Sequence, residues 1–292
     1  MRGWRPVILT VLFTLIAATL IARTLLGFQY ERPTLASEAR DTTYQEYNEL
    51  LERYASAEGV DYPTLRNDLL GERVYGYFAD YGPRNAPEDF PTDETRLAYG
   101  INAYNALMRI AIARHWPVES PLDIHGAIEP VDGFGIFQAR RFRVDGKKIS
   151  LATLHKQLRA NPAYDPRVRL ALACGGQSCP TVEAPAYTGV GLDQELSDAV
   201  TRLLAQEKHL RVDETSRAII VHPMLMLYQE EFEAWAQAQS PALSFESWLV
   251  AHSPTSLHLE ARLAEGYALE AAPISWTVDS LHATDPQPAS TP

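Results

Sequence analysis

The chain has 292 residues, of which 46% are hydrophobic and 22% are charged, and its formal net charge is −11. This length and composition suit one large globular domain or two modest ones. An acidic chain without a basic stripe repels phosphate backbones, so we expect no nucleic-acid binding.

The N-terminal segment, residues 1–28, is predicted to be a signal anchor or a signal peptide. Two arginines precede an uncharged run at residues 7–22, and Arg23 follows it. The run spans about 24 Å as a helix, less than the ~30 Å hydrocarbon core, but counting on to residue 28 gives a length that could span. The positive flank favours export of the remaining chain. We expect an N-terminal transmembrane helix that anchors the domain on the periplasmic side, or secretion to the periplasm if the segment is cleaved.

Three further segments are predicted from composition. Residues 29–42 are polar and are predicted to tether the domain to the membrane. Residues 43–282 are predicted to form one domain, and residues 283–292, rich in proline, serine and threonine, a disordered tail. Thr43 and Glu46 have the spacing of a capping box, which predicts a helix at the start of the domain.

The most regular predicted helix begins near Thr92, and Thr92 or Asp93 can cap it. Apolar residues recur along it at helical spacing, namely Leu97, Ile101, Tyr104, Met108 and Ala111. Asn102 and Asn105 lie one turn apart beside this stripe, and a buried asparagine needs hydrogen-bond partners. Two roles are open for this pair. The asparagines either bracket a neighbouring loop or strand, or orient a catalytic group or a substrate.

A β-hairpin is predicted in the middle of the chain. Residues 142–144 and 147–149 flank Asp145-Gly146, which is a strong type I′ turn signal. Ser150 can cap the next helix, on which His155 shares a face with leucines and therefore points toward the core or a crevice.

Both cysteines lie in one short stretch. Residues 168–173 form an apolar run that predicts a buried strand, and Cys174-Gly175-Gly176 follows as a turn, with Cys179 before a proline. A buried strand that ends in a glycine turn presents reactive atoms on rigid support. In an oxidising compartment two cysteines five residues apart can instead form a disulfide.

The last part of the chain mixes strands and helices. Residues 210–212 and 218–221 predict a second hairpin, and His222 can cap a helix that opens at Pro223. A final short strand is expected between Tyr267 and Val278, around Trp276. The predicted fold class is α+β, a helix-rich single domain whose hairpins form a small, mainly antiparallel sheet.

Several of these motifs, in this order, resemble the family known as domain of unknown function 547. The matching stretches cover about residues 45–280 and are residues 60–62, 101–107, 145–151, 165–167 and 174–180, with Tyr228 and Phe232. The resemblance implies a family whose biochemical role is not settled. The chain departs from the family pattern where His155-Lys156 stands for a Glu-His pair and where Arg169 lies in a segment that tends to carry a histidine. Where the family has Trp-Ser-Leu-Asn near its end, this chain has Trp-Thr-Val-Asp at residues 276–279.

Two functions follow as alternatives. The first is a binding or interaction module of the cell envelope, with an envelope protein or a cell-wall component as partner. The absent family histidines and a disulfide between the cysteines favour it. No metal and no cofactor are expected, because the histidines are scattered and no P-loop or dinucleotide fingerprint is present.

The second alternative is a cysteine-dependent hydrolase or acyl transferase with a papain-like or transglutaminase-like fold. Such an enzyme needs a thiolate, a base, a group that orients the base and donors for an oxyanion. Its candidate residues are Cys179 as nucleophile, His155 or His125 as base, Asn102 or Asn105 as orienting group, and Cys174, Gly175 and Gly176 beside the nucleophile.

Overall fold

In the computed structural model, which describes residues 4–182 and 184–282, helix α5 (Asp93–His115) forms the centre of the main hydrophobic cluster. Thr92 caps it by accepting a hydrogen bond from the backbone N–H of Thr95, as predicted. Every residue from 97 to 113 is buried, which is wider than the predicted stripe. A helix that is covered on all sides lies inside a core rather than on its surface.

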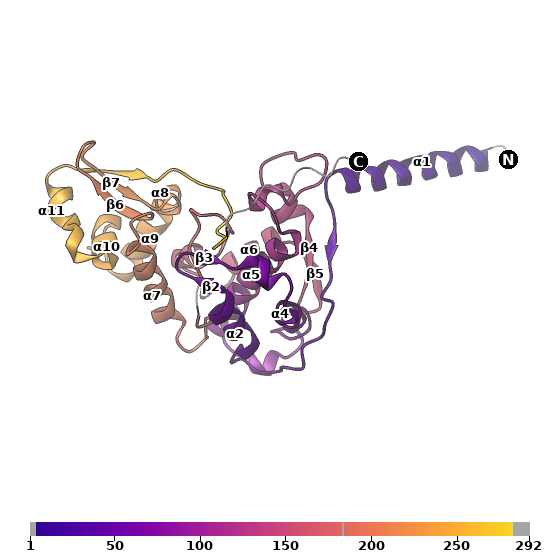
Figure 1. Cartoon of the computed structure of the whole chain (residues 1–292), viewed down its shortest axis with the longest axis horizontal. Helices are drawn as coiled ribbons and strands as arrows, with labels where there is room; N and C mark the ends of the chain where they lie inside the picture. Colours follow the sequence, from indigo (N-terminus) through magenta and orange to yellow (C-terminus); the bar gives the residue numbers. More distant parts are fainter. Residues whose placement is uncertain (1–3, 183, 283–292) are drawn as a thin grey trace.

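The helices and strands from β1 to α6 surround α5 (Figure 1). They are β1 (Tyr30–Glu31), α2 (Gln45–Tyr54), β2 (Ala55–Ser56), β3 (Gly59–Val60), α3 (Tyr62–Leu65), α4 (Leu69–Asp80), β4 (Arg141–Val144), β5 (Lys147–Ile149) and α6 (Leu151–Arg159). Asp145 and Gly146 have φ values of 47° and 74°, which confirms the predicted type I′ hairpin between β4 and β5.

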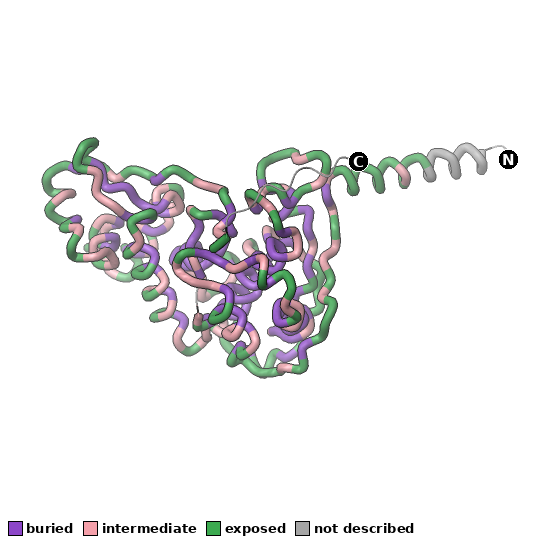
Figure 2. Tube along the Cα trace, in the orientation of Figure 1, coloured by how far each residue is buried: buried purple, intermediate pink, exposed green. Residues whose placement is uncertain are grey.

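The later elements enclose a second hydrophobic cluster (Figures 1 and 2). They are α7 (Leu192–Leu204), β6 (Leu210–Asp213), β7 (Ala218–Val221), α8 (Pro223–Leu227), α9 (Gln229–Gln239), α10 (Phe245–His252), α11 (Leu259–Ala264) and β8 (Ala268–Ala271). The second predicted hairpin, at residues 210–212 and 218–221, corresponds to β6 and β7. The aromatic rings of Phe232, Phe245 and Trp248 contact one another inside this cluster.

The predicted α+β class is confirmed, but within residues 4–182 and 184–282 the strands form three small sheets instead of one. Their orders are β1-β4-β5, β2-β3 and β6-β7-β8. The pairs β1–β4 and β7–β8 are parallel, so hairpins account for only part of the pairing. The third strand of each larger sheet comes from a distant part of the chain, which local patterns do not reveal.

The predicted N-terminal transmembrane helix is wrong. Helix α1 (Trp4–Leu25) extends away from the rest of the molecule in Figure 1. Within the described residues, no helix is both long and apolar enough to cross a membrane. The uncharged run at residues 7–22 covers only about 24 Å of the ~30 Å hydrocarbon core, and Arg23 lies in the last turn of the helix.

Residues 29–42, predicted to be a tether, lie against the domain. β1 pairs with β4, the hydroxyl of Tyr75 donates to the carbonyl of Glu31, and Ser37 is buried. A Cβ atom at Gly76 would lie 2.3 Å from the carbonyl oxygen of Leu35, so the segment passes directly over a glycine of α4. The predicted tail at residues 283–292 lies outside the described residues.

The predicted capping box at Thr43 and Glu46 does not form. Helix α2 begins after Tyr44, whose φ is 54°, and Thr43 does not cap it. The Glu46 carboxylate accepts from Ser37 and Arg73 instead of closing a capping box. The last strand, expected between Tyr267 and Val278, is β8, which lies within these bounds but ends before Trp276.

Candidate functional site

Asn102 and Asn105 hold two loops against α5. The side chain of Asn102 donates to Tyr187 O at 2.8 Å and accepts from Tyr187 N at 3.0 Å. Asn105 donates to Ala171 O and accepts from Ala173 N, both at 2.8 Å. Their exposures are 1% and 0%. Both amides are therefore committed to backbone groups, and neither orients a histidine.

The Asn105 contacts also explain why the predicted buried strand does not form. Residues Pro166–Leu170 are a 3₁₀ helix, and the backbone after it is irregular. The side chain of Asn105 satisfies Ala171 O and Ala173 N, which a neighbouring strand would otherwise do. An apolar run shows burial but cannot show where the backbone hydrogen bonds go.

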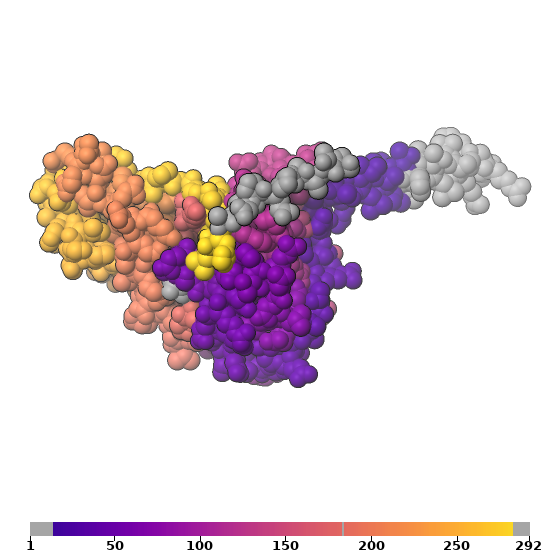
Figure 3. All heavy atoms as spheres, viewed as in Figure 1, coloured from indigo at the N-terminus to yellow at the C-terminus, as the bar shows by residue number. Residues whose placement is uncertain are grey.

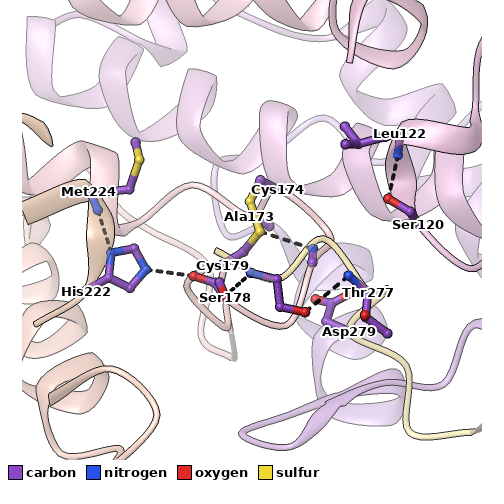
Figure 4. The surroundings of a disulfide bond; sticks show 12 residues. Ser120, Leu122, Ala173, Cys174, Ser178, Cys179, His222, Met224, Thr277 and Asp279 are labelled. Atoms are coloured by element: carbon purple, nitrogen blue, oxygen red, sulfur yellow. Dashed lines mark hydrogen bonds between the residues drawn. A yellow bond between two sulfur atoms is a disulfide. The ribbon is translucent and has the colours of Figure 1, made fainter. Parts of the chain in front are cut away.

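Cys174 and Cys179 form a disulfide with a Cα–Cα distance of 5.5 Å (Figure 4). The part of the chain that the structure describes contains no free cysteine. In this state Cys179 has no thiol to act as a nucleophile, since the thiolate is the reacting species.

Four N–H groups of the disulfide turn already have acceptors. Gly176 N donates to Cys179 Sγ at 3.1 Å, and Cys179 N donates to Gly176 O at 2.8 Å. Gln177 N donates to Thr277 O at 2.8 Å, and Ser178 N donates to Ser275 O at 3.3 Å. An oxyanion hole needs N–H groups directed at an empty position. These four N–H groups donate to other groups of the fold, so they are not available to bind an oxyanion.

The C-terminal segment holds this turn in place. Ser275 N donates to the hydroxyl of Ser178 at 2.7 Å, and Val278 forms a bridge with Gly176. Ser280 bridges Val60 on β3. In Figure 3 the last coloured residues, in yellow, sit on the purple surface of the N-terminal part. Residues 275–280 thus cover one side of the disulfide turn.

A cavity of about 190 Å³ lies on another side of the disulfide, between the two hydrophobic clusters. Its wall is mostly apolar. Its apolar side chains include Phe137, Leu172, Met224, Ile274 and Trp276. Both half-cystines line the cavity as well, together with the polar side chains Tyr104, His155, Arg169 and His222.

His222 is fixed by hydrogen bonds at both ring nitrogens (Figure 4). Nδ1 accepts from Met224 N at 3.2 Å and caps α8, as predicted, and Nε2 lies 2.9 Å from Ser178 O. This pattern requires the neutral ring with the proton on Nε2. Burial lowers the pKa of His222 to about 4, so the ring positions the disulfide turn and does not serve as a base.

His155 is the predicted base candidate that does reach the cavity. Neither ring nitrogen forms a hydrogen bond with another described residue, and the ring lies 6.4 Å from that of Tyr104. Burial, then the charges of Arg169 and Arg159, lower the pKa of His155. His125 lies elsewhere, with Nδ1 at its neighbour Gly126 O and Nε2 3.6 Å from Glu129.

Arg169 is a cavity residue that sequence reasoning did not propose as functional. Its side chain is only 1% exposed. Nε and Nη2 donate to Glu231 Oε2 at 3.0 and 2.7 Å, and the guanidinium lies 3.4 Å from the ring centre of Tyr228. The available signal was a cationic residue inside an apolar run, because buried charge requires a partner.

A model of the family described as protein of unknown function, DUF547, matches residues 88–204. The match covers α5, the β4–β5 hairpin, α6, the disulfide turn and α7. No curated protein and no solved structure is similar enough to the chain to count as a match. Among the described residues, no cluster of three or more histidine, cysteine or acidic side chains could hold a metal ion.

Proposed function

This chain is a DUF547 domain-containing protein, and we propose that it is a binding module which takes a small apolar ligand in the cavity beside the disulfide. The observation that carries the proposal is the mostly apolar cavity, in a region where the groups needed for thiol chemistry are already engaged. An apolar cavity of about 150 Å³ stays dry and binds benzene in another protein. A cavity of about 190 Å³ therefore suits a ligand of slightly larger size.

The substitution Met224→Trp should abolish ligand binding by filling this cavity. Met224 lines it from α8 and is half-buried. Met226→Trp is the matched control, because Met226 is half-buried on the same helix but does not line the cavity. The measurement is the rise in Tm with 1-octanol, since a ligand that binds only the folded state stabilises it. Equal rises for both variants would count against the cavity as the ligand site.

The proposed compartment is outside the cytoplasm. The positive N-terminal flank with its uncharged run favours export, and disulfides persist in oxidising compartments. A fusion of the full chain to a reporter that is active only in the periplasm should be active. Reporter activity in the cytoplasm alone would contradict export. An envelope protein or cell-wall component as partner stays a prediction.

A cysteine-dependent hydrolase or acyl transferase is the second candidate, because Cys179 and His155 line the same cavity. This function requires a thiol reductant, which supplies two electrons and two protons to convert the disulfide into two thiols. The proposed binding module has no such requirement.

Thiol labelling separates the two functions. The oxidised protein should take up no iodoacetamide until it is reduced, and both cysteines should then be labelled. Labelling of the reduced protein should be much slower at pH 6 than at pH 8 if no base activates the thiols, because the thiolate is the reacting species. Equal rates at both pH values would show a thiolate activated by a neighbouring base and would support the enzyme.

A further inference from the structure

We propose that Arg169 and His155, two polar side chains in the wall of the cavity beside the disulfide, bind the carboxylate of a small acid whose apolar body fills the remaining space. The inference rests on the proposed function, since it names the ligand class of the same site. Arg169 and His155 together are called the polar end, and Phe137, Leu172 and Trp276 belong to the apolar wall.

Arg169 supplies the donors for the acid. Glu231 accepts hydrogen bonds from Nε and Nη2 of Arg169, but Nη1 has no hydrogen-bond partner among the described residues. The side chain is 1% exposed and lines the cavity, so the cavity is the side from which a ligand can approach the guanidinium. Hydrogen bonds between a guanidinium and a carboxylate are among the stronger ones in proteins.

The charge around the polar end favours an anion. Arg169 and Arg159 both act on the imidazole of His155 as positive charges, and Glu231 acts on it as the one negative charge. Arg169 is paired with Glu231, and Arg159 is exposed and lies outside the cavity wall. Both arginines would attract a bound carboxylate, whereas they would repel an ammonium group. A buried carboxylate needs such a partner, because its desolvation is otherwise costly.

The remaining wall limits the body of the ligand. The rings of Phe137 and Trp276 contact each other edge to face, with their centres 6.3 Å apart. Leu172 and Met224 also belong to the apolar lining. By comparison with the benzene-sized cavity, about 190 Å³ admits a phenyl ring or an alkyl chain of roughly six to eight carbons. Octanoate and 1-octanol form a suitable pair, because they share the chain and differ in the head group.

Calorimetric titration of the full, oxidised protein at pH 7 tests the head group. Octanoate should bind about tenfold more tightly than 1-octanol, as expected for a hydrogen bond to a charged group. Arg169→Gln should reduce the ratio of the octanoate and 1-octanol affinities from about ten to about one. Glu231→Gln should strengthen octanoate binding, because it removes the negative charge beside Arg169, and it should leave 1-octanol unchanged.

The outcomes distinguish this inference from the proposed function. Equal affinity for octanoate and 1-octanol, or an octanoate affinity that Glu231→Gln does not raise, would overturn the carboxylate inference and leave the apolar binding module in place. No binding of either compound would remove both. If Arg169→Gln does not fold, the ratio of the two ligands and the Glu231→Gln variant still decide the question.

Discussion

Acidification from pH 7 to pH 4.5 should lower the free energy of unfolding by roughly 5 kcal/mol through His209 and His222 alone. Both histidines are only 1% exposed, and their ring centres lie 4.9 Å apart. Burial lowers the pKa of His222 to about 4 and, with the charge of a protonated His222 as the next cause, lowers the pKa of His209 to about 3.

The sign follows from comparison with the unfolded chain, in which a histidine has a pKa of about 6.5. The unfolded chain binds protons first as the pH falls, so the stabilisation is fully present above pH 6.5 and is lost progressively toward pH 4. Each histidine contributes about 1.4 kcal/mol for every pH unit in this range.

His209→Leu provides the direct test. Nε2 of His209 is buried without a hydrogen-bond partner, so leucine should be tolerated at pH 7. The loss of unfolding free energy between pH 7 and pH 4.5, measured by urea denaturation, should shrink by about 2–3 kcal/mol in this variant. His258→Asn removes an exposed histidine at a position with φ of 50°, which asparagine tolerates, and should leave the loss unchanged. An equal loss in wild type and His209→Leu would refute this account.

Asn105→Ala should lower the free energy of unfolding by about 3 kcal/mol. The change leaves Ala171 O and Ala173 N buried without partners, and each unsatisfied group costs roughly 1–3 kcal/mol. The Tm should fall by roughly 6–12 °C in a protein of this size. Thermal unfolding followed by circular dichroism measures the change.

Asn67→Ala is the matched control for that substitution. Asn67 is exposed, and its side chain donates one hydrogen bond, to Pro63 O at 2.9 Å. Its loss should cost no more than about 0.5 kcal/mol. A similar small change for Asn105→Ala would mean that water satisfies the two backbone groups, and that the loop before the disulfide does not depend on α5.

Features that depend on neighbouring residues were predictable from the sequence. Thr92 caps α5, Ser150 caps α6 and His222 caps α8, because each cap satisfies N–H groups two or three residues away. The turn at residues 145–146 follows from Asp-Gly in the same way. These interactions are local, so the tertiary structure only has to permit them.

Features decided by distant contacts were not predictable. The apolar run before Cys174 is irregular because Asn105 provides its hydrogen bonds. Of the candidate site residues, the structure brings His155, Cys174 and Cys179 to one cavity and assigns Asn102 and Asn105 to backbone. The pairing of the two cysteines was one of the two alternatives that the sequence left open.

Residues 275–280 cover the disulfide turn, and this contact affects the order of folding during synthesis. Thr277 O, Ser275 O and the bridge at Val278 satisfy groups on a turn about a hundred residues earlier. A nascent chain folds from its N-terminus as it leaves the ribosome. Until residues 275–280 emerge, that turn lacks these partners and the cavity lacks the wall contributed by Ile274 and Trp276. A ribosome-bound intermediate can therefore form the core around α5 apart from Val278, but not the complete cavity.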